Sequence, residues 1–90
     1  MCSRLLCVET ILPRYYFDIH DGAEVQRDAH GIECASAAAA TVEAKRVLPA
    51  IAADEVPRDG DHRKYTVVVR DTLGAPLYTA SLSFVGTWLT

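Results

Sequence analysis

The sequence lacks the features that would assign it to a membrane or to a nucleic acid. No apolar run approaches the roughly 20 residues that a membrane-spanning helix needs. Nine basic residues are scattered along the chain and are outnumbered by twelve acidic ones, for a net charge of −3, whereas proteins that bind phosphate backbones cluster Lys and Arg. We therefore expect neither a membrane segment nor nucleic-acid binding.

Cysteine is also scarce. Cys2, Cys7 and Cys34 are odd in number and too few for a disulfide framework. Disulfide frameworks are typical of secreted small domains. Their lack here favours a reducing, cytoplasmic location.

The chain is short, with 90 residues of which half are apolar. This length predicts one domain, and a domain of this size buries only about 60% of its unfolded surface. Self-association would add to its thin margin of stability. We accordingly expect a homodimer.

Residues 1–12 differ from the rest of the chain. They hold one Arg and a few apolar positions, but Glu9 interrupts them and no small-residue cleavage site follows, so they do not resemble a signal peptide. We interpret residues 1–12 as an N-terminal extension outside the domain, and residues 13–90 as a single α+β domain.

One long helical segment is predicted from Ser36 to Asp54. Ser36 is a good N-cap. Pro49 cannot donate a backbone hydrogen bond, so the helix either kinks there or stops near Leu48; we favour the kink because Ile51 continues the apolar spacing. The stripe with i, i+3, i+4, i+7 spacing consists of Ala37, Ala40, Ala44, Val47, Leu48 and Ile51.

Extended segments flank this helix on both sides. Alternation of apolar and polar residues, bounded by turn residues, predicts four strands. The Asp21-Gly22 dipeptide favours a hairpin turn between the first two, with Val25 inward on the second. The four strands are Arg14–His20, Ala23–Arg27, Lys64–Asp71 and Leu77–Val85.

The segments between these elements are predicted from their composition. Ile32 is expected to pack as a buried apolar residue at the N-terminal end of the helix, and Cys34 is expected to be a small buried thiol. Val56 to Arg63 is rich in charge and holds Pro and Gly, which is typical of an exposed loop. Gly74 is the residue in the last turn best able to take a positive φ.

The sequence therefore predicts an α+β fold of order β-β-α-β-β, a four-stranded antiparallel sheet with one helix packed on one face. Ten residues are expected to face the helix. They are Tyr15, Phe17, Ile19, Tyr65, Val67, Val69, Tyr78, Ala80, Leu82 and Phe84.

Three features of the sequence together resemble a family of short bacterial proteins built on a domain of unknown function. They are the run Pro13-Arg-Tyr-Tyr-Phe-Asp-Ile-His-Asp-Gly22, the alanine-rich helix and the later Val69-Arg70-Asp71. The likeness extends from Pro13 to Gly86. It implies a fold and no activity. In that family the chain usually begins with Met directly before the Pro-Arg-Tyr run, whereas here twelve residues precede Pro13. The resemblance therefore implies that the first residues here are an extension or a misplaced start.

A second likeness is shorter. The chain is similar to the antitoxin of the HicA–HicB toxin–antitoxin pair in the order of its elements: a strand, an Asp-Gly turn, a second strand, the sequence Gly-Ile-Glu-Cys and a helix that contains Glu-Ala. The antitoxin fold, however, usually has three strands before its helix. The likeness implies a small toxin as partner.

Two groups of residues contain side chains that could support chemistry. Asp18, His20 and Asp21 supply groups that a general base or a divalent metal would need, but polar residues before a hairpin turn are ordinarily solvated. His30 and Cys34, with the two N-terminal cysteines, do not fit the spacing of compact zinc sites. We therefore expect no catalytic residue, no cofactor and no metal ion.

The remaining candidate is the sheet face away from the helix, which a single helix leaves uncovered. Our leading interpretation is a non-enzymatic protein-interaction or regulatory module that uses this face. The alternative is a small-molecule binder or enzyme that uses Asp18, His20 and Arg70. The candidate partner or ligand residues are Tyr16, Asp18, His20, Thr66, Val68 and Arg70.

Overall fold

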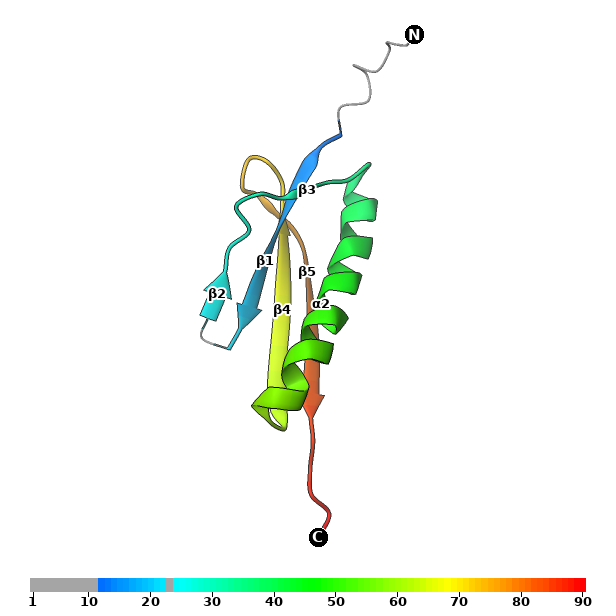
Figure 1. Cartoon of the computed structure of the whole chain (residues 1–90). Helices are drawn as coiled ribbons and strands as arrows, with labels where there is room; N and C mark the ends of the chain where they lie inside the picture. The colour runs from blue at the N-terminus through cyan, green and yellow to red at the C-terminus, as the bar shows by residue number, and fades with distance from the viewer. Residues whose placement is uncertain (1–11, 23) are drawn as a thin grey trace.

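The computed structural model describes residues 12–22 and 24–90, and Figure 1 shows one helix beside an antiparallel sheet. The predicted α+β class, with one helix on one face of an open sheet, is confirmed. Within the described ranges no helix is long and apolar enough to cross a membrane. The elements are β1 Arg14–Asp21, β2 Glu24–Gln26, β3 Ile32–Glu33, α2 Ala37–Asp59, β4 His62–Arg70 and β5 Pro76–Val85.

The sheet has five strands, so the predicted number of four and the order β-β-α-β-β are corrected. Four strands follow the order β2-β1-β4-β5, and the short β3 also pairs with β1. β2 pairs with the end of β1 and β3 with its start, where Arg14 lies opposite Glu33. A hydrogen bond of 3.0 Å from the Cys34 amide to the Pro13 carbonyl extends this pairing. β2 and β3 thus form one edge strand with an interruption between them.

Helix α2 begins where the sequence predicts and ends later. The Ser36 hydroxyl accepts a hydrogen bond of 3.1 Å from the Ala39 amide, as an N-cap does. The helix then runs through Pro49 to Asp59, so the alternative of a stop near Leu48 is wrong.

The predicted loop over Val56–Arg63 is also wrong. Its first residues belong to α2, and its last two, His62 and Arg63, already belong to β4. Val56 packs against the core, and this burial stabilises a last helical turn that composition alone disfavours. The helix ends at Gly60, whose φ of 109° suits glycine.

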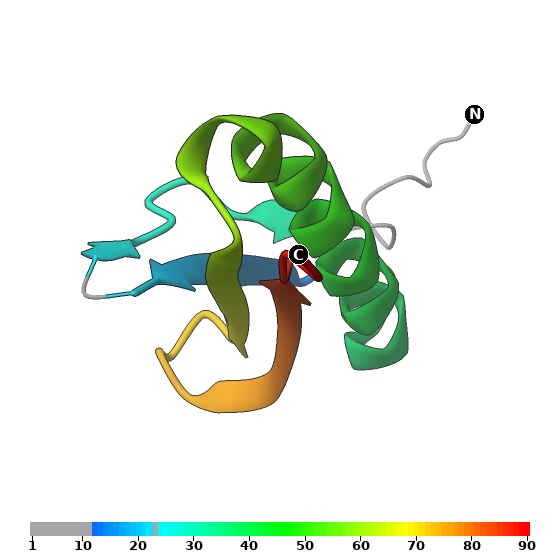
Figure 2. The same cartoon turned by 90° about the horizontal axis from the view of Figure 1, so that it is seen from below.

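The core lies between α2 and the concave side of the sheet. Figure 2, viewed from below, shows the helix on one side of the strands and β2 at the far edge. The small Ala40 and Ala44 are fully buried, so the helix approaches β4 closely. The buried apolar residues are Tyr15, Phe17, Cys34, Ala40, Ala44, Leu48, Tyr65, Val67 and Val69.

The predicted strand facing holds for β1 and β4, and Cys34 is buried as expected. Three inward predictions fail. Val25 is 50% exposed and Ile32 is 43% exposed, because β2 and β3 lie at the edge beyond the cover of the helix. Phe84 shares the helix-facing side of β5 but is exposed, since it lies opposite Arg63 near the open end of the sheet.

Phe17→Ala should destabilise the domain by about 3–5 kcal/mol, because Phe17 is 7% exposed and its removal leaves a cavity in a small core. Tyr16→Ala, one residue away on the opposite face, should cost far less. Urea unfolding of both variants measures the difference. Equal or reversed effects would contradict the facing of β1, because a slip of one residue exchanges the two faces.

Candidate functional site

The six predicted site residues do lie together. They occupy the sheet face opposite α2, which we call the outer face. β1 and β4 bring them into register as three cross-strand pairs, since residues directly opposite on paired strands point to the same side. The pairs are Tyr16 with Arg70, Asp18 with Val68, and His20 with Thr66.

Two of these six residues, Asp18 and Arg70, form an ion pair. The Arg70 Nε donates to Asp18 Oδ2 at 2.6 Å, and Arg70 Nη2 donates to Asp18 Oδ1 at 3.0 Å. The guanidinium also lies 5.3 Å from the centre of the Tyr16 ring. Asp18 is only 4% exposed, so this bidentate ion pair replaces the water that its carboxylate would otherwise bind.

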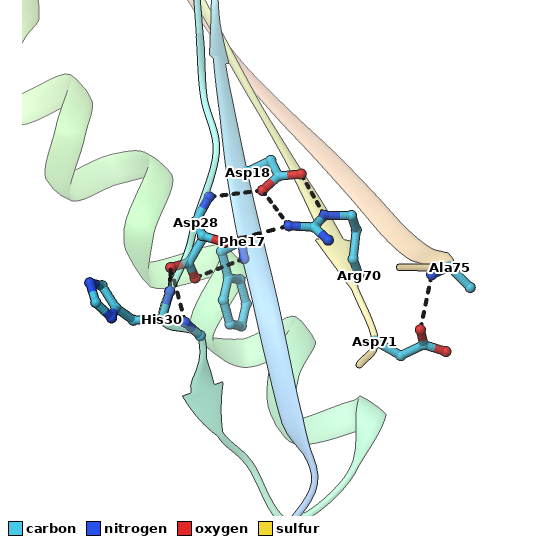
Figure 3. A network of polar contacts seen from close by, with 8 residues as sticks. Phe17, Asp18, Asp28, His30, Arg70, Asp71 and Ala75 are labelled. Atoms are coloured by element: carbon cyan, nitrogen blue, oxygen red, sulfur yellow. Dashed lines mark hydrogen bonds and ion pairs between the residues drawn. The ribbon is translucent and has the colours of Figure 1, made fainter. Parts of the chain in front are cut away.

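Asp28 completes the network, as Figure 3 shows. It lies in the interruption between β2 and β3 and fills the missing ladder position beside β1. Its Oδ2 accepts from the Phe17 amide at 3.1 Å, and its Oδ1 accepts from the amides of His30 and Gly31 at 3.1 and 3.0 Å. Its own amide donates to Asp18 Oδ1 at 3.0 Å.

Both carboxylates of this network have lowered pKa values. Hydrogen bonding from Arg70 lowers the pKa of Asp18 and outweighs the opposing effect of burial. Burial raises the pKa of Asp28, but hydrogen bonds from the amides of Gly31, Phe17 and His30 together lower it further. Both groups are therefore charged at neutral pH.

This geometry stabilises the fold and does not suit Asp18 or Asp28 to act as a general base. A general base needs a pKa near the working pH and an acceptor within reach of the substrate. Asp18 and Asp28 have pKa values far below neutral, and all four carboxylate oxygens already accept hydrogen bonds. Among the described residues no group of three or more His, Cys, Asp or Glu is arranged to hold a metal ion.

Of the charged residues in this network, Asp28 lines a cavity of about 420 Å³. Four cavities of about 250–420 Å³ are lined by residues other than Asp18, His20 and Arg70. One of about 370 Å³ runs between α2 and β5 and has no charged lining residue. We call it the helix–strand groove; it is lined by Pro49, Ala52, Ala53, Val56, Pro57, Tyr65, Leu82, Ser83 and Phe84.

Sequence reasoning missed Asp28 as a site residue. A signal was present, because Asp followed three residues later by Gly is typical of a turn closed by the Asp side chain. It also missed Arg63, whose Nη2 lies 2.6 Å from Asp21 Oδ2 and 3.7 Å from Glu55 Oε1. This ion pair connects β1, β4 and α2, and distant partners of this kind leave no local pattern.

Asp28→Asn should destabilise the domain by about 1–3 kcal/mol at pH 7, because an amide NH₂ would replace one acceptor that faces backbone N–H groups. The lowered pKa of Asp28 means that its carboxylate stabilises the fold above about pH 4 and loses this effect as the pH falls through its folded pKa. The difference from wild type should therefore shrink toward pH 2–3.

The matched control is Asp54→Asn, which removes an exposed helix pair with Arg58 and should change stability by less than about 0.5 kcal/mol. Thermal unfolding of all three proteins across this pH range measures both effects. An Asp28→Asn variant as stable as the control at pH 7 would contradict the role of this carboxylate.

Comparison with known proteins adds a family and no activity. No curated protein and no solved structure matches the chain significantly. One family model, described as "Domain of unknown function (DUF6894)", matches residues 14–83. This span runs from the first residue of β1 into β5 and includes Asp18, Asp28 and Arg70. The chain therefore belongs to the DUF6894 family, a family of proteins with a domain of unknown function.

Proposed function

We propose that this protein is a non-enzymatic protein-interaction or regulatory module of the bacterial cytoplasm and that it works as a homodimer. The observation that carries the proposal is the edge of the sheet at β5. This strand pairs with β4 alone among the described strands, so its other edge is open over Pro76–Val85. From residue 72 to residue 90 the chain contains no charged side chain.

Such an edge favours association. An open strand presents unpaired N–H and C=O groups, and monomeric proteins usually protect it with charges, proline or bulges. In β5 the only proline is Pro76 and the register shift lies beside Arg70, both at the same end. The remainder of the edge, from Leu77 to Val85, has no such protection. Two identical uncharged edges can meet without like-charge repulsion.

The outer face supports the enzyme alternative poorly. Asp18 and Arg70 bind each other at 2.6 Å and are unavailable to a ligand unless this ion pair is broken. Removing one partner of a buried ion pair costs about 3–5 kcal/mol, which a small ligand would have to offset. A toxin of the HicA kind would also bind an exposed surface. If the chain does not self-associate, binding of such a toxin becomes the favoured proposal.

Light scattering after size-exclusion chromatography should give twice the chain mass at micromolar concentration and a shift toward the monomer on dilution. Val68→Glu places a charge on the outer face and should leave the dimer intact if β5 is the contact. Dissociation of this variant would move the contact to the outer face. A monomer at every concentration would overturn the homodimer.

A further inference from the structure

We propose that the C-terminal residues 86–90 of a second copy pair with the open edge of β5 and place Trp88 in the helix–strand groove, in a reciprocal exchange. This inference rests on the proposed homodimer and names its interface. The observations behind it are one apolar groove, one exposed tryptophan and the strand register that relates the two.

The groove suits an aromatic side chain. Its walls combine apolar residues of α2 with side chains of β4 and β5, and none of them is charged. Cavities of about 150 Å³ bind benzene, so about 370 Å³ is ample for an indole ring. Phe84 forms one wall and is exposed, which leaves aromatic surface available for contact.

The occupant is present on the chain itself. Trp88 is the only tryptophan and is 84% exposed, and the adjacent Leu89 is 94% exposed. Both belong to the uncharged stretch from residue 72 to residue 90. The groove and the tail both lack charged side chains and therefore match in apolar character. Burial of Trp88 and Leu89 would remove their apolar surface from water.

Strand register directs Trp88 to the correct face. Side chains alternate along a strand, so continuing β5 places residue 88 on the same side as Leu82 and Phe84, which face α2. Residues directly opposite each other in an antiparallel pair point to the same face. With the two-fold axis at Val85, Trp88 of the second copy lies opposite Leu82, beside the groove wall formed by Ala52 and Ala53.

The tail of the same molecule does not reach this position. The Gly86 amide donates to the Asp61 carbonyl at 2.7 Å, which keeps the chain aligned with the start of β4 beyond Val85. Figure 1 shows the C-terminal residues leaving the domain in the direction of β5. Trp88 is accordingly 84% exposed and does not lie in the groove of its own chain.

The contact is large enough for a modest dimer. An aromatic side chain of this size buries roughly 150–250 Å², and each exchanged tail also covers groove and strand surface. Two tails together bury on the order of 1,000 Å², near the lower limit of roughly 1,200 Å² for specific interfaces. This size fits an association that dilution can reverse.

The test uses the fluorescence of the single Trp88 in the full chain, with acrylamide as quencher. As protein concentration rises through the dimer transition, Trp88 emission should shift to shorter wavelength and its quenching constant should fall at least about threefold, because the indole leaves water. Ala53→Arg places a long charged side chain in the groove and should weaken dimerisation at least tenfold. Ala50→Arg is the control, because Ala50 is an exposed alanine of α2 that does not line the groove.

Circular dichroism verifies that both variants keep the helix. A dimer in which Trp88 stays fully quenchable and Ala53→Arg associates like Ala50→Arg would overturn this interface and leave the homodimer standing. If Trp88 were buried at every protein concentration, the exchange of C-terminal residues between two copies would be overturned, because each tail would then occupy the groove of its own chain. A monomer at all concentrations would overturn both proposals.

Discussion

The structure depends on the carboxylate of Asp28, which takes the place of a missing strand residue between β2 and β3. It accepts hydrogen bonds from Phe17 on β1 and from His30 and Gly31 in the interruption. A buried N–H without a partner costs about as much as a lost hydrogen bond, so this side chain allows the edge strand to be interrupted beside the core. The backbone amide of Asp28 also donates a hydrogen bond to Asp18, and Asp18 in turn accepts one from Arg70 on β4. The network thereby connects the edge of the sheet to its central pair of strands.

On the helix-facing side, the core consists of apolar packing at short range. Ala40 and Ala44 allow α2 to lie close to β4, where Tyr65, Val67 and Val69 are almost fully buried. The core is thin, and α2 covers mainly β4 and β5. Two ion pairs extend this frame at opposite ends of the β1–β4 pair: Asp18 with Arg70 on the outer face, and Asp21 with Arg63 on the helix side. In both, a β1 carboxylate and a β4 arginine meet across the central pair of strands.

Much of this fold follows from local patterns, and the exceptions have physical causes. Period-two alternation predicts the faces of β1 and β4, and Ser36 with the apolar stripe predicts the start of α2. The end of α2 was not predictable from composition, because burial of Val56 outweighs the proline and charges around it. β3 consists of two residues and is held by long-range pairing, which leaves no periodic signal. Asp18 and Arg70 were identified as neighbours on one face, but their burial against Asp28 depends on a loop whose path the sequence does not reveal. The prediction that residues 1–12 form an extension falls almost wholly outside the described residues and stays a prediction.

These features assign different tasks to the two surfaces of the sheet. The charged cluster on the outer face stabilises the fold, and the uncharged edge at β5 is the surface that we propose binds a second copy. The most direct test of this account is a ¹³C-detected NMR titration of the Asp18 and Asp28 side-chain carboxyl groups. Hydrogen bonds from Arg70 and from backbone amides predict that both pKa values lie below the ordinary value of 3.8. A value above 3.8 for either group would mean that its carboxylate is not held by these donors, and would return the cluster to consideration as a reactive site.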